Sequence, residues 1–312
     1  MANAALSSPS NVRDHRPPAA VARVATAPVN WNNDDLPGWA PEVPFPDLLD
    51  EMVAAGYAAT ELGGNFPSDP TLLAAALALR DMTLCGSYLW LDLLAAEFSA
   101  TASVVLDERL RLLAAVGCQD LVVAATMTPA RVAIAGRVAA CGRDGLSADE
   151  WICLGANLSA VAGLAAERTV RVHYHNHVGT FVETPAEVER LLGVLPDGVD
   201  LCFDTGHFLY GGGEPAAFVK RHGDRIGYVH LKDVALPTLG RCRERGTSFL
   251  GALREGIFCE LGNGGAEVET LVDALLNGGF AGWLVVEQDT TLGLPTACAR
   301  VSRRFLRERF GL

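Results

Sequence analysis

Three of the seven histidines of this 312-residue chain stand at alternate positions of one short stretch. In VHYHNHVGTFVE (172–183), single residues separate His173, His175 and His177, and Glu183 closes the stretch. If the stretch is a strand, its three imidazoles share one face. Such a face is open to three interpretations: a metal site, a proton relay, or a strand that simply carries imidazoles.

Carboxylates and imidazoles also end other apolar stretches. CFDTGH contains Asp204 and His207, YVHLKD contains His230 and Lys232, and VVEQD contains Glu287. An isolated ionisable group among apolar residues costs several kcal/mol unless it is paired or binds a metal. One divalent cation would compensate Asp204, His230 and Glu287 together. Carboxylates with imidazole suit Mn²⁺, Co²⁺ or Mg²⁺ better than a closed structural zinc site.

These groups need a frame that brings strand ends together. Segments of helical period separate eight strand-like runs that are apolar throughout: 22–29, 56–62, 82–89, 119–125, 169–176, 199–205, 225–233 and 282–289. Eight such βα units predict an α/β fold, a closed (β/α)₈ TIM barrel with a parallel sheet. An open doubly wound sheet is the alternative, but the first turn, PVNWNNDDLPGW, lacks the glycine-rich phosphate loop of that fold.

The barrel prediction fixes the domain organisation. Residues 1–22, rich in Ala, Ser and Pro, are expected to form a disordered tail, and residues 23–312 a single catalytic barrel domain. The connection 235–265, after the seventh strand, is long enough for a lid or active-site loop.

In a (β/α)₈ barrel, the chemistry gathers where strands meet the loops that follow them. Late-strand residues are therefore the expected site: Trp31, Asn32, Glu61, His175, His177, Asp204, His207, His230, Lys232 and Glu287. His173 lies earlier in its strand and is expected to be a core or supporting imidazole. Trp31 has two interpretations, packing in the barrel or stacking on a sugar ring.

Composition excludes several classes of partner. The net charge of −12 argues against nucleic acid and anionic membranes, because both need a basic surface. No apolar run reaches the roughly 18–20 residues of a membrane helix. Eight scattered cysteines without a CxxC pair indicate reduced thiols and a cytoplasmic location. Barrels of this size often pair, so a homo-oligomer is compatible with the sequence, although no segment marks an interface.

Several motifs together resemble one family. PVNWNNDDLP, GYAATELG, HNHVGTFVET, CFDTGHFLYGGG, YVHLKDV, GIFCELGNGG and GWLVVEQD are similar to those of inosose dehydratases (2-keto-myo-inositol dehydratases), in the xylose isomerase-like barrel superfamily. The resemblance runs from about Ala27 to the C-terminus. Sugar isomerases and epimerases of the superfamily share DTGH, HLKD and EQD, whereas NWNNDDLP and HxHxGTxVE narrow the resemblance to the dehydratases.

The resemblance implies one divalent cation, Mn²⁺ or Co²⁺ first and Mg²⁺ or Zn²⁺ as alternatives, held by Glu, Asp, His and a second Glu at successive strand ends. Asp204, His230 and Glu287 match the last three ligands. Where many relatives read ENH, this sequence reads HNH. Glu183 is therefore the preferred first ligand, because it offers a hard oxygen, and His175 is its alternative.

The implied reaction converts 2-keto-myo-inositol to a trihydroxycyclohexane-dione and water, in inositol catabolism, through an enediolate. Glu183 or Glu287 would take the α-proton. His207, His177 or Lys232 would protonate the leaving hydroxyl or hold oxygens of this small polyol or ketose substrate.

Three other functions fit the same barrel. A metal-dependent ketose isomerase or epimerase would use the same ligands but return the proton. A phosphodiesterase or abasic-site nuclease would need more metal ligands and a basic groove. An inactive sugar-binding protein would keep the pocket without the chemistry.

Overall fold

The computed structural model describes residues 22–138 and 145–312. Its eight parallel strands are β1 (Arg23–Thr26), β2 (Ala59–Leu62), β3 (Thr83–Leu91), β4 (Asp120–Ala125), β5 (Arg171–His175), β6 (Val199–Asp204), β7 (Ile226–Leu231) and β10 (Trp283–Val286). They close a barrel in the order β1-β10-β7-β6-β5-β4-β3-β2. The predicted (β/α)₈ barrel is confirmed; of the predicted tail, residues 1–21 lie outside the described residues.

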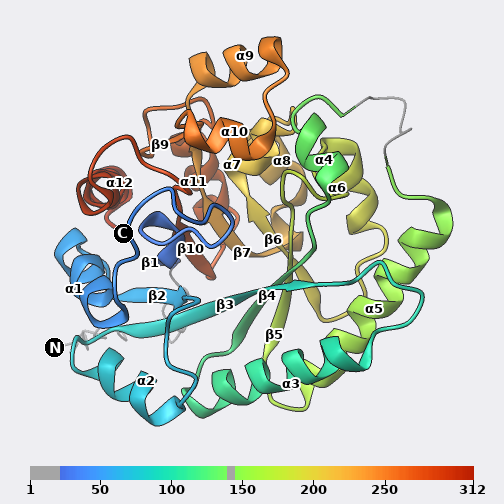
Figure 1. Ribbon diagram of the computed structural model, residues 1–312, viewed down its shortest axis with the longest axis horizontal. Coiled ribbons are helices and arrows are strands. Elements are labelled where there is room, and N and C mark those ends of the chain that lie inside the picture. Colours follow the sequence, from blue (N-terminus) through green and yellow to red (C-terminus); the bar gives the residue numbers. More distant parts are fainter. Residues whose placement is uncertain (1–21, 139–144) are drawn as a thin grey trace, which may run out of the picture.

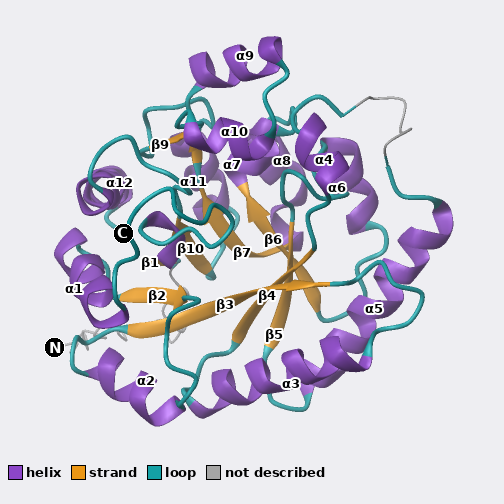
Figure 2. Ribbon diagram, in the orientation of Figure 1, coloured by secondary structure: helices purple, strands orange, loops and turns teal. Residues whose placement is uncertain are grey.

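Helices surround this barrel (Figures 1 and 2). The sequence predicted one helix after each barrel strand, and these helices are α1 (Phe45–Ala55), α2 (Pro70–Ala78), α3 (Ala100–Ala115), α5 (Ala148–Ala166), α6 (Pro185–Leu192), α8 (Pro215–His222), α11 (Val268–Asn277) and α12 (Pro295–Phe310). Four further helices are present in the described ranges: α4 (Pro129–Ile134), α7 (Thr205–Tyr210), α9 (Leu236–Arg245) and α10 (Phe249–Arg254). No helix of those ranges combines the length and the apolar character needed to cross a membrane.

Local sequence signals set the ends of the helices. Ser147 with Glu150 and Thr184 with Glu187 form capping boxes that satisfy the first N–H groups of α5 and α6. Gly56 ends α1 with φ of +98°, a conformation that glycine adopts without strain. These signals fix where each helix returns the chain to the sheet.

The barrel strands are apolar because both of their faces are covered. Every residue of β4 is buried, and the main core contains side chains from the strands and from the inner faces of the helices. Polar groups occur at the two ends of the barrel, where the strands leave this core.

The long connection after β7 has structure of its own. It forms α9 and α10, and β9 (Phe258–Cys259) pairs with β8 (Asp233–Val234) as a small antiparallel sheet. The Asp233 carboxylate accepts hydrogen bonds from the N–H groups of Gly262, Gly264 and Ala266, which fixes the return of the chain. In Figure 1, α9, α10 and β9 lie together beyond one end of the barrel.

Candidate active site

Four neighbouring strands end in ionisable side chains. His175 ends β5, Asp204 ends β6, His230 lies one residue before the end of β7, and Glu287 follows β10 directly. Register pairs His230 with Asp204 and Val285, and His175 with Cys202, so the four side chains lie within two residues of the level of His230, at the same end of the barrel. All four are buried. The barrel thus brings together the late-strand residues that the sequence singled out.

His230 lies between carboxylates on both sides of its ring. Its Nδ1 is 3.1 Å from Glu287 Oε2 and 3.9 Å from Asp204 Oδ2, and its Nε2 is 2.9 Å from Glu61 Oε1. The Tyr228 hydroxyl also donates to Glu61 Oε1, at 2.8 Å. Burial opposes the charged ring, but Cys202, Glu287 and Glu61 outweigh burial and raise the pKa of His230.

The DTGH motif holds Asp204 with its two oxygens in different roles. Oδ1 accepts the N–H of His207 at 2.7 Å and so caps α7. Oδ2 faces the site and lies 3.4 Å from His175 Nε2. The Asn176 amide exchanges two hydrogen bonds with the Asp204 backbone, which ties the ends of β5 and β6 together.

Lys232 is the buried cation of this cluster. Its Nζ lies 3.2 Å from Asp204 Oδ2, 2.9 Å from Glu287 Oε2 and 2.8 Å from Asp289 Oδ1. Although burial opposes its charge, these carboxylates raise the pKa of Lys232. Burial likewise disfavours the charged carboxylates, yet the neighbouring cations lower the pKa of Asp204 and of Glu287.

Burial is the largest cause of the pKa shifts of three further histidines and of Asp289. Burial lowers the pKa of His175, His177 and His207, so these rings are neutral near pH 7. Burial, together with repulsion from Glu287, raises the pKa of Asp289 to about 6 in spite of Lys232.

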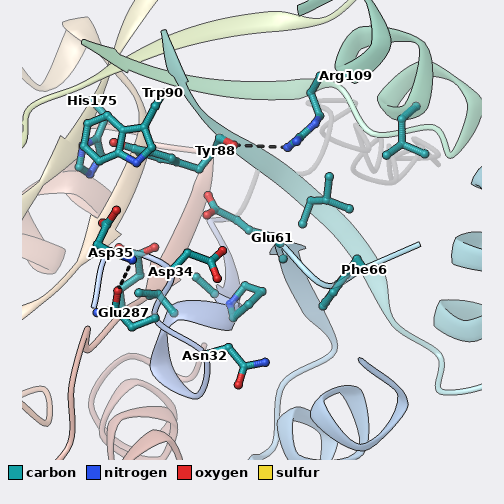
Figure 3. A pocket seen from close by; sticks show the side chains of 18 of the residues that line it. Asn32, Asp34, Asp35, Glu61, Phe66, Tyr88, Trp90, Arg109, His175 and Glu287 are labelled. Atoms are coloured by element: carbon teal, nitrogen blue, oxygen red, sulfur yellow. Dashed lines mark hydrogen bonds between the residues drawn. The ribbon is translucent and has the colours of Figure 1, made fainter. Parts of the chain in front are cut away.

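A cavity of about 1050 Å³ opens onto these groups. Figure 3 shows its interior, with Asp35, Glu287 and His175 on one side and Glu61 near the middle. His177, His230, Lys232 and Asp289 also line it. The cavity and the strand-end cluster therefore form one site at the carboxyl ends of the strands, as expected for this fold.

The donor atoms fit a divalent cation. Two groups of three donors have ligand atoms within 4.8 Å of one another: Glu61, His230 and Glu287, and His175, Cys202 and His230. The buried Nδ1 of His175 has no hydrogen-bond partner. Carboxylates and imidazoles in excess over one ammonium are a suitable environment for Mn²⁺, Co²⁺ or Zn²⁺.

Glu183, the preferred first ligand, lies elsewhere. Its carboxylate accepts hydrogen bonds from Gly136 N at 2.7 Å and Gly179 N at 2.9 Å, and Oε2 is 3.8 Å from the Arg131 guanidinium. Burial raises its pKa despite these partners. Glu183 belongs to neither group of cation donors and does not line the cavity. Its alternative, His175, belongs to one of these groups and lines the cavity. Its backbone partners fix the loop after β5.

Two other expected contacts with substrate lie outside the cavity lining. Trp31 is buried in the core, and its indole N–H donates to Thr296 Oγ1 at 3.0 Å. His207 is fully buried, and its Nε2 lies 3.0 Å from Lys232 Nζ. It therefore contacts the lysine on the side away from the cavity. Asn32 does line the cavity, but its amide exchanges two hydrogen bonds with the Val43 backbone.

The sequence reasoning missed the aromatic residues of β3. Tyr88 and Trp90 line the cavity, and the Tyr88 ring lies edge-on to His175 at 5.3 Å between centroids. The buried Tyr88 hydroxyl has no hydrogen-bond partner. The strand-end rule that identified the other residues could have found both, because they stand near the end of the third predicted strand.

Comparison with known proteins identifies the family. The family model described as xylose isomerase-like TIM barrel matches residues 49–309. The rhizopine catabolism protein MocC of Rhizobium meliloti is 36% identical over 91% of this chain and 87% of its own. The inosose dehydratase of Geobacillus thermodenitrificans is 32% identical over 93% and 98%.

Solved structures share the same fold at low sequence identity. The probable 3-DHS dehydratase AsbF of Bacillus anthracis superimposes with a TM-score of 0.71 at 12% identity, covering 92% of this chain and 99% of its own. The IOLI protein with a binding zinc atom gives 0.67 at 14% identity, covering 93% and 100%. The chain therefore belongs to the xylose isomerase-like TIM barrel family, and its sequence resemblance to inosose dehydratases is confirmed.

Proposed function

We propose that this protein is a hydro-lyase that removes water from a ketocyclitol, 2-keto-myo-inositol, in inositol catabolism. The observation that carries the proposal is the likeness to inosose dehydratases over more than nine-tenths of both chains, as in the relative from Geobacillus thermodenitrificans. A strand-end cavity with carboxylates, imidazoles and a buried ammonium supports it, because elimination next to a ketone needs both a base and a proton donor.

We assign the cation ligands to His175, Asp204, His230 and Glu287. His175 takes the place that we expected for Glu183, because His175 Nε2 lies 3.4 Å from Asp204 Oδ2, whereas the Glu183 carboxylate accepts hydrogen bonds from Gly136 and Gly179. A divalent cation bound there would polarise the substrate ketone and stabilise negative charge as the α-proton leaves. Glu61 would orient His230 through its Nε2, as carboxylates commonly do for histidine ligands.

The chain's own groups would move the protons. Glu287 is our candidate base for the α-proton, since its carboxylate is ionised and lines the cavity. Lys232 and His177 would hold substrate oxygens or donate the proton with which the β-hydroxyl leaves as water. The C–H electron pair then forms the new carbon–carbon double bond. His207 would act only by holding Lys232 in place.

Turnover of 2-keto-myo-inositol by the purified protein tests this function. We expect the protein to form the dione, which is detected by its ultraviolet absorbance. A chelator should stop dione formation, and Glu287→Gln should lower its rate at least 100-fold. Formation of an epimer without the dione would instead identify the metal-dependent isomerase or epimerase alternative. No turnover with intact cation binding would favour a sugar-binding protein.

A second candidate comes from the 36% identity to MocC. That relative is described as a rhizopine catabolism protein, so a role in rhizopine catabolism competes with the role in inositol catabolism. The same assay decides between them when compounds derived from rhizopine are compared with 2-keto-myo-inositol by kcat/KM. A cytoplasmic location and a homo-oligomeric state remain predictions of either role.

A further inference from the structure

The cavity is larger than its chemistry requires. Its volume of about 1050 Å³ reaches the upper end of the range for drug-sized ligands, whereas a cyclitol is a single small ring. Beyond the strand-end cluster, the cavity continues into a part that we call the outer lobe, lined by Phe66, Pro67, Pro70, Arg109 and Leu112. Figure 3 shows Arg109 and Phe66 on the side of Glu61 opposite to His175 and Glu287.

The outer lobe exists because two adjacent strands differ in length. β2 ends at Leu62, which pairs with Ser87, whereas β3 continues to Leu91. The last residues of β3 therefore pair with β4 but not with β2. The chain leaves β2 through Gly63, where a Cβ would lie 2.9 Å from the Phe66 ring, so a larger residue would intrude on the lobe. The cavity passes through this gap toward α3.

Arg109, on α3, is partly buried, and its charged guanidinium lines the lobe. Its Nη1 donates to Ser87 Oγ at 2.5 Å and to the Tyr88 carbonyl at 3.4 Å. No carboxylate among the described residues forms an ion pair with Arg109. Burial lowers the pKa of its guanidinium, as expected for a cation that has lost water without gaining an anion.

The neighbours of Arg109 leave its charge available to a ligand. Arg111 also lines the lobe, but it is exposed and lies 2.7 Å from Asp107. Glu108 is exposed at the same rim. At the opposite end, the carboxylates that line the strand-end part of the cavity outnumber Lys232, the ammonium that they surround. The cavity therefore has an acidic end for a cation and a polyol, and a basic end at Arg109.

We propose that the outer lobe is a subsite for an anionic substituent, a carboxylate or a phosphate, on a ligand whose polyol or ketose ring occupies the strand-end part of the cavity. The position of the ring rests on the proposed function. Arg109 orients the ligand, because its guanidinium has no carboxylate partner in the part of the chain that the structure describes, whereas the ammonium of Lys232 at the other end already lies among three carboxylates. Arg109 suits this role, since a guanidinium binds either oxyanion with two parallel hydrogen bonds, and its nitrogens other than Nη1 have no hydrogen bond within the described residues.

Binding measurements on the full chain test the subsite without any turnover. Isothermal titration would compare myo-inositol with myo-inositol 1-phosphate, and glucose with glucuronate, so that the phosphate and the carboxylate are separate arms. We expect at least one anionic compound to bind tenfold or more tightly than its neutral partner. If the anionic and the neutral compound bind equally tightly in both comparisons, the proposal is overturned.

Variants locate the effect. Arg109→Met should reduce the preference for the anionic compound to about one, whereas Arg304→Met, which removes the same charge from the exposed surface of α12 outside the cavity lining, should keep it. Equal losses in both variants, or a preference that survives in Arg109→Met, would refute the subsite. Arg109→Lys retains the charge and should keep part of the preference, so it decides the matter if Arg109→Met does not fold.

The subsite and the proposed function can fail separately. Turnover of 2-keto-myo-inositol without any anion preference would leave the dehydratase proposal standing and remove the subsite. Anion preference that depends on Arg109, with no dione formed, would do the reverse and direct the search to ketoses that carry an acidic group.

Discussion

Lys232 is the residue on which the charge balance of the site depends. The sequence contains only two lysines, and this one places its ammonium within 3.2 Å of three carboxylates, from Asp204, Glu287 and Asp289. Removing water from so many charges is costly, and a buried cation at their centre offsets much of the repulsion. The ammonium therefore stabilises the cluster even without a bound cation.

Replacing Lys232 by Met tests this balance. In metal-free protein we expect Lys232→Met to lower the free energy of unfolding by about 3–5 kcal/mol, because it leaves buried carboxylates without their cation. The measurement is urea unfolding with a chelator present. Lys220→Met is the matched control, since Lys220 is exposed on α8 and should change stability by less than about 0.5 kcal/mol. Equal effects of the two substitutions would contradict the assignment.

We infer that Glu61 acts on the site through His230. Because Glu61 Oε1 contacts His230 Nε2 at 2.9 Å, Glu61→Gln should lose the charge that holds the imidazole orientation. We expect the affinity for the divalent cation to fall about 10- to 100-fold. Competition with a fluorescent chelator measures it, and Glu269→Gln, on the exposed surface of α11, is the control. Unchanged affinity would mean that Glu61 does not support the cation through His230.

The sequence predicts some site residues and not others for a physical reason. Asp204, His230 and Glu287 are each fixed by the strand that carries them, so the strand-end rule is sufficient to place them. The direction of Glu183 depends on N–H groups of Gly136 and Gly179, the first of them 47 residues away. No strand pattern encodes such a contact. The sequence pattern also does not predict that Arg109 lines the cavity, because this depends on where β2 ends.

At the scale of elements, β5 serves both ends of the barrel. A strand rises about 3.3 Å per residue, so His173 and His175 lie on one face at different depths. His173 Nε2 is 2.9 Å from Asp120 Oδ1 at the start of β4, and Arg171 also donates to the Asp120 carboxylate. The first imidazole therefore joins two strands, while the second faces the cavity.

The Asp120 cluster predicts a pH dependence of stability. Although burial opposes it, hydrogen bonds from His173 and Arg171 lower the pKa of Asp120 below its ordinary 3.8. A lowered pKa in the folded state adds stability above the unfolded value, and this stability is lost as the pH falls through the folded pKa. Asp120→Asn should therefore cost about 1.5–3 kcal/mol at pH 7 and much less at pH 3, where the unfolded carboxyl is protonated.

Urea unfolding at the two pH values measures this difference. Asp197→Asn, in the exposed turn before β6, is the control and should show no pH-dependent difference from wild type. A cost of Asp120→Asn that is the same at pH 3 and pH 7 would mean that the hydrogen-bond geometry, not the charge, carries the stability.

The sequence predicted the barrel strands and their covering helices but not the small elements between them. Apolar runs and caps such as Ser147 are local signals, and they found β1 to β7, β10 and the long helices. α7 is only six residues long and begins directly after Asp204, the last residue of β6, so its pattern follows the strand without a break. α10 and β9 depend on packing, with Phe249 of α10 against His177 and Phe258 of β9 against His207.

For the whole molecule, the closed barrel separates stability from chemistry. Its covered strands and inner helix faces form the main core, while the carboxyl ends of the strands collect more carboxylates than cations. The net charge of −12 adds to the negative potential there. A divalent cation is the partner that this excess favours, and its binding should therefore be visible in the stability of the entire fold.

Removal of divalent cations should lower the melting temperature of the whole protein. A ligand at 100 times its dissociation constant stabilises the folded state by about 2.7 kcal/mol, if it does not bind the unfolded chain. For a chain of this length that corresponds to roughly 5 °C. We expect a chelator to lower the melting temperature by about this amount, and Mn²⁺, Co²⁺ or Zn²⁺ to restore it.

Asp204→Asn should melt lower and lose the response, because an amide is a weaker ligand and leaves Lys232 less well paired. An equal cation response in wild type and Asp204→Asn would place the ion elsewhere, and no response in wild type would argue against a cation in the folded protein.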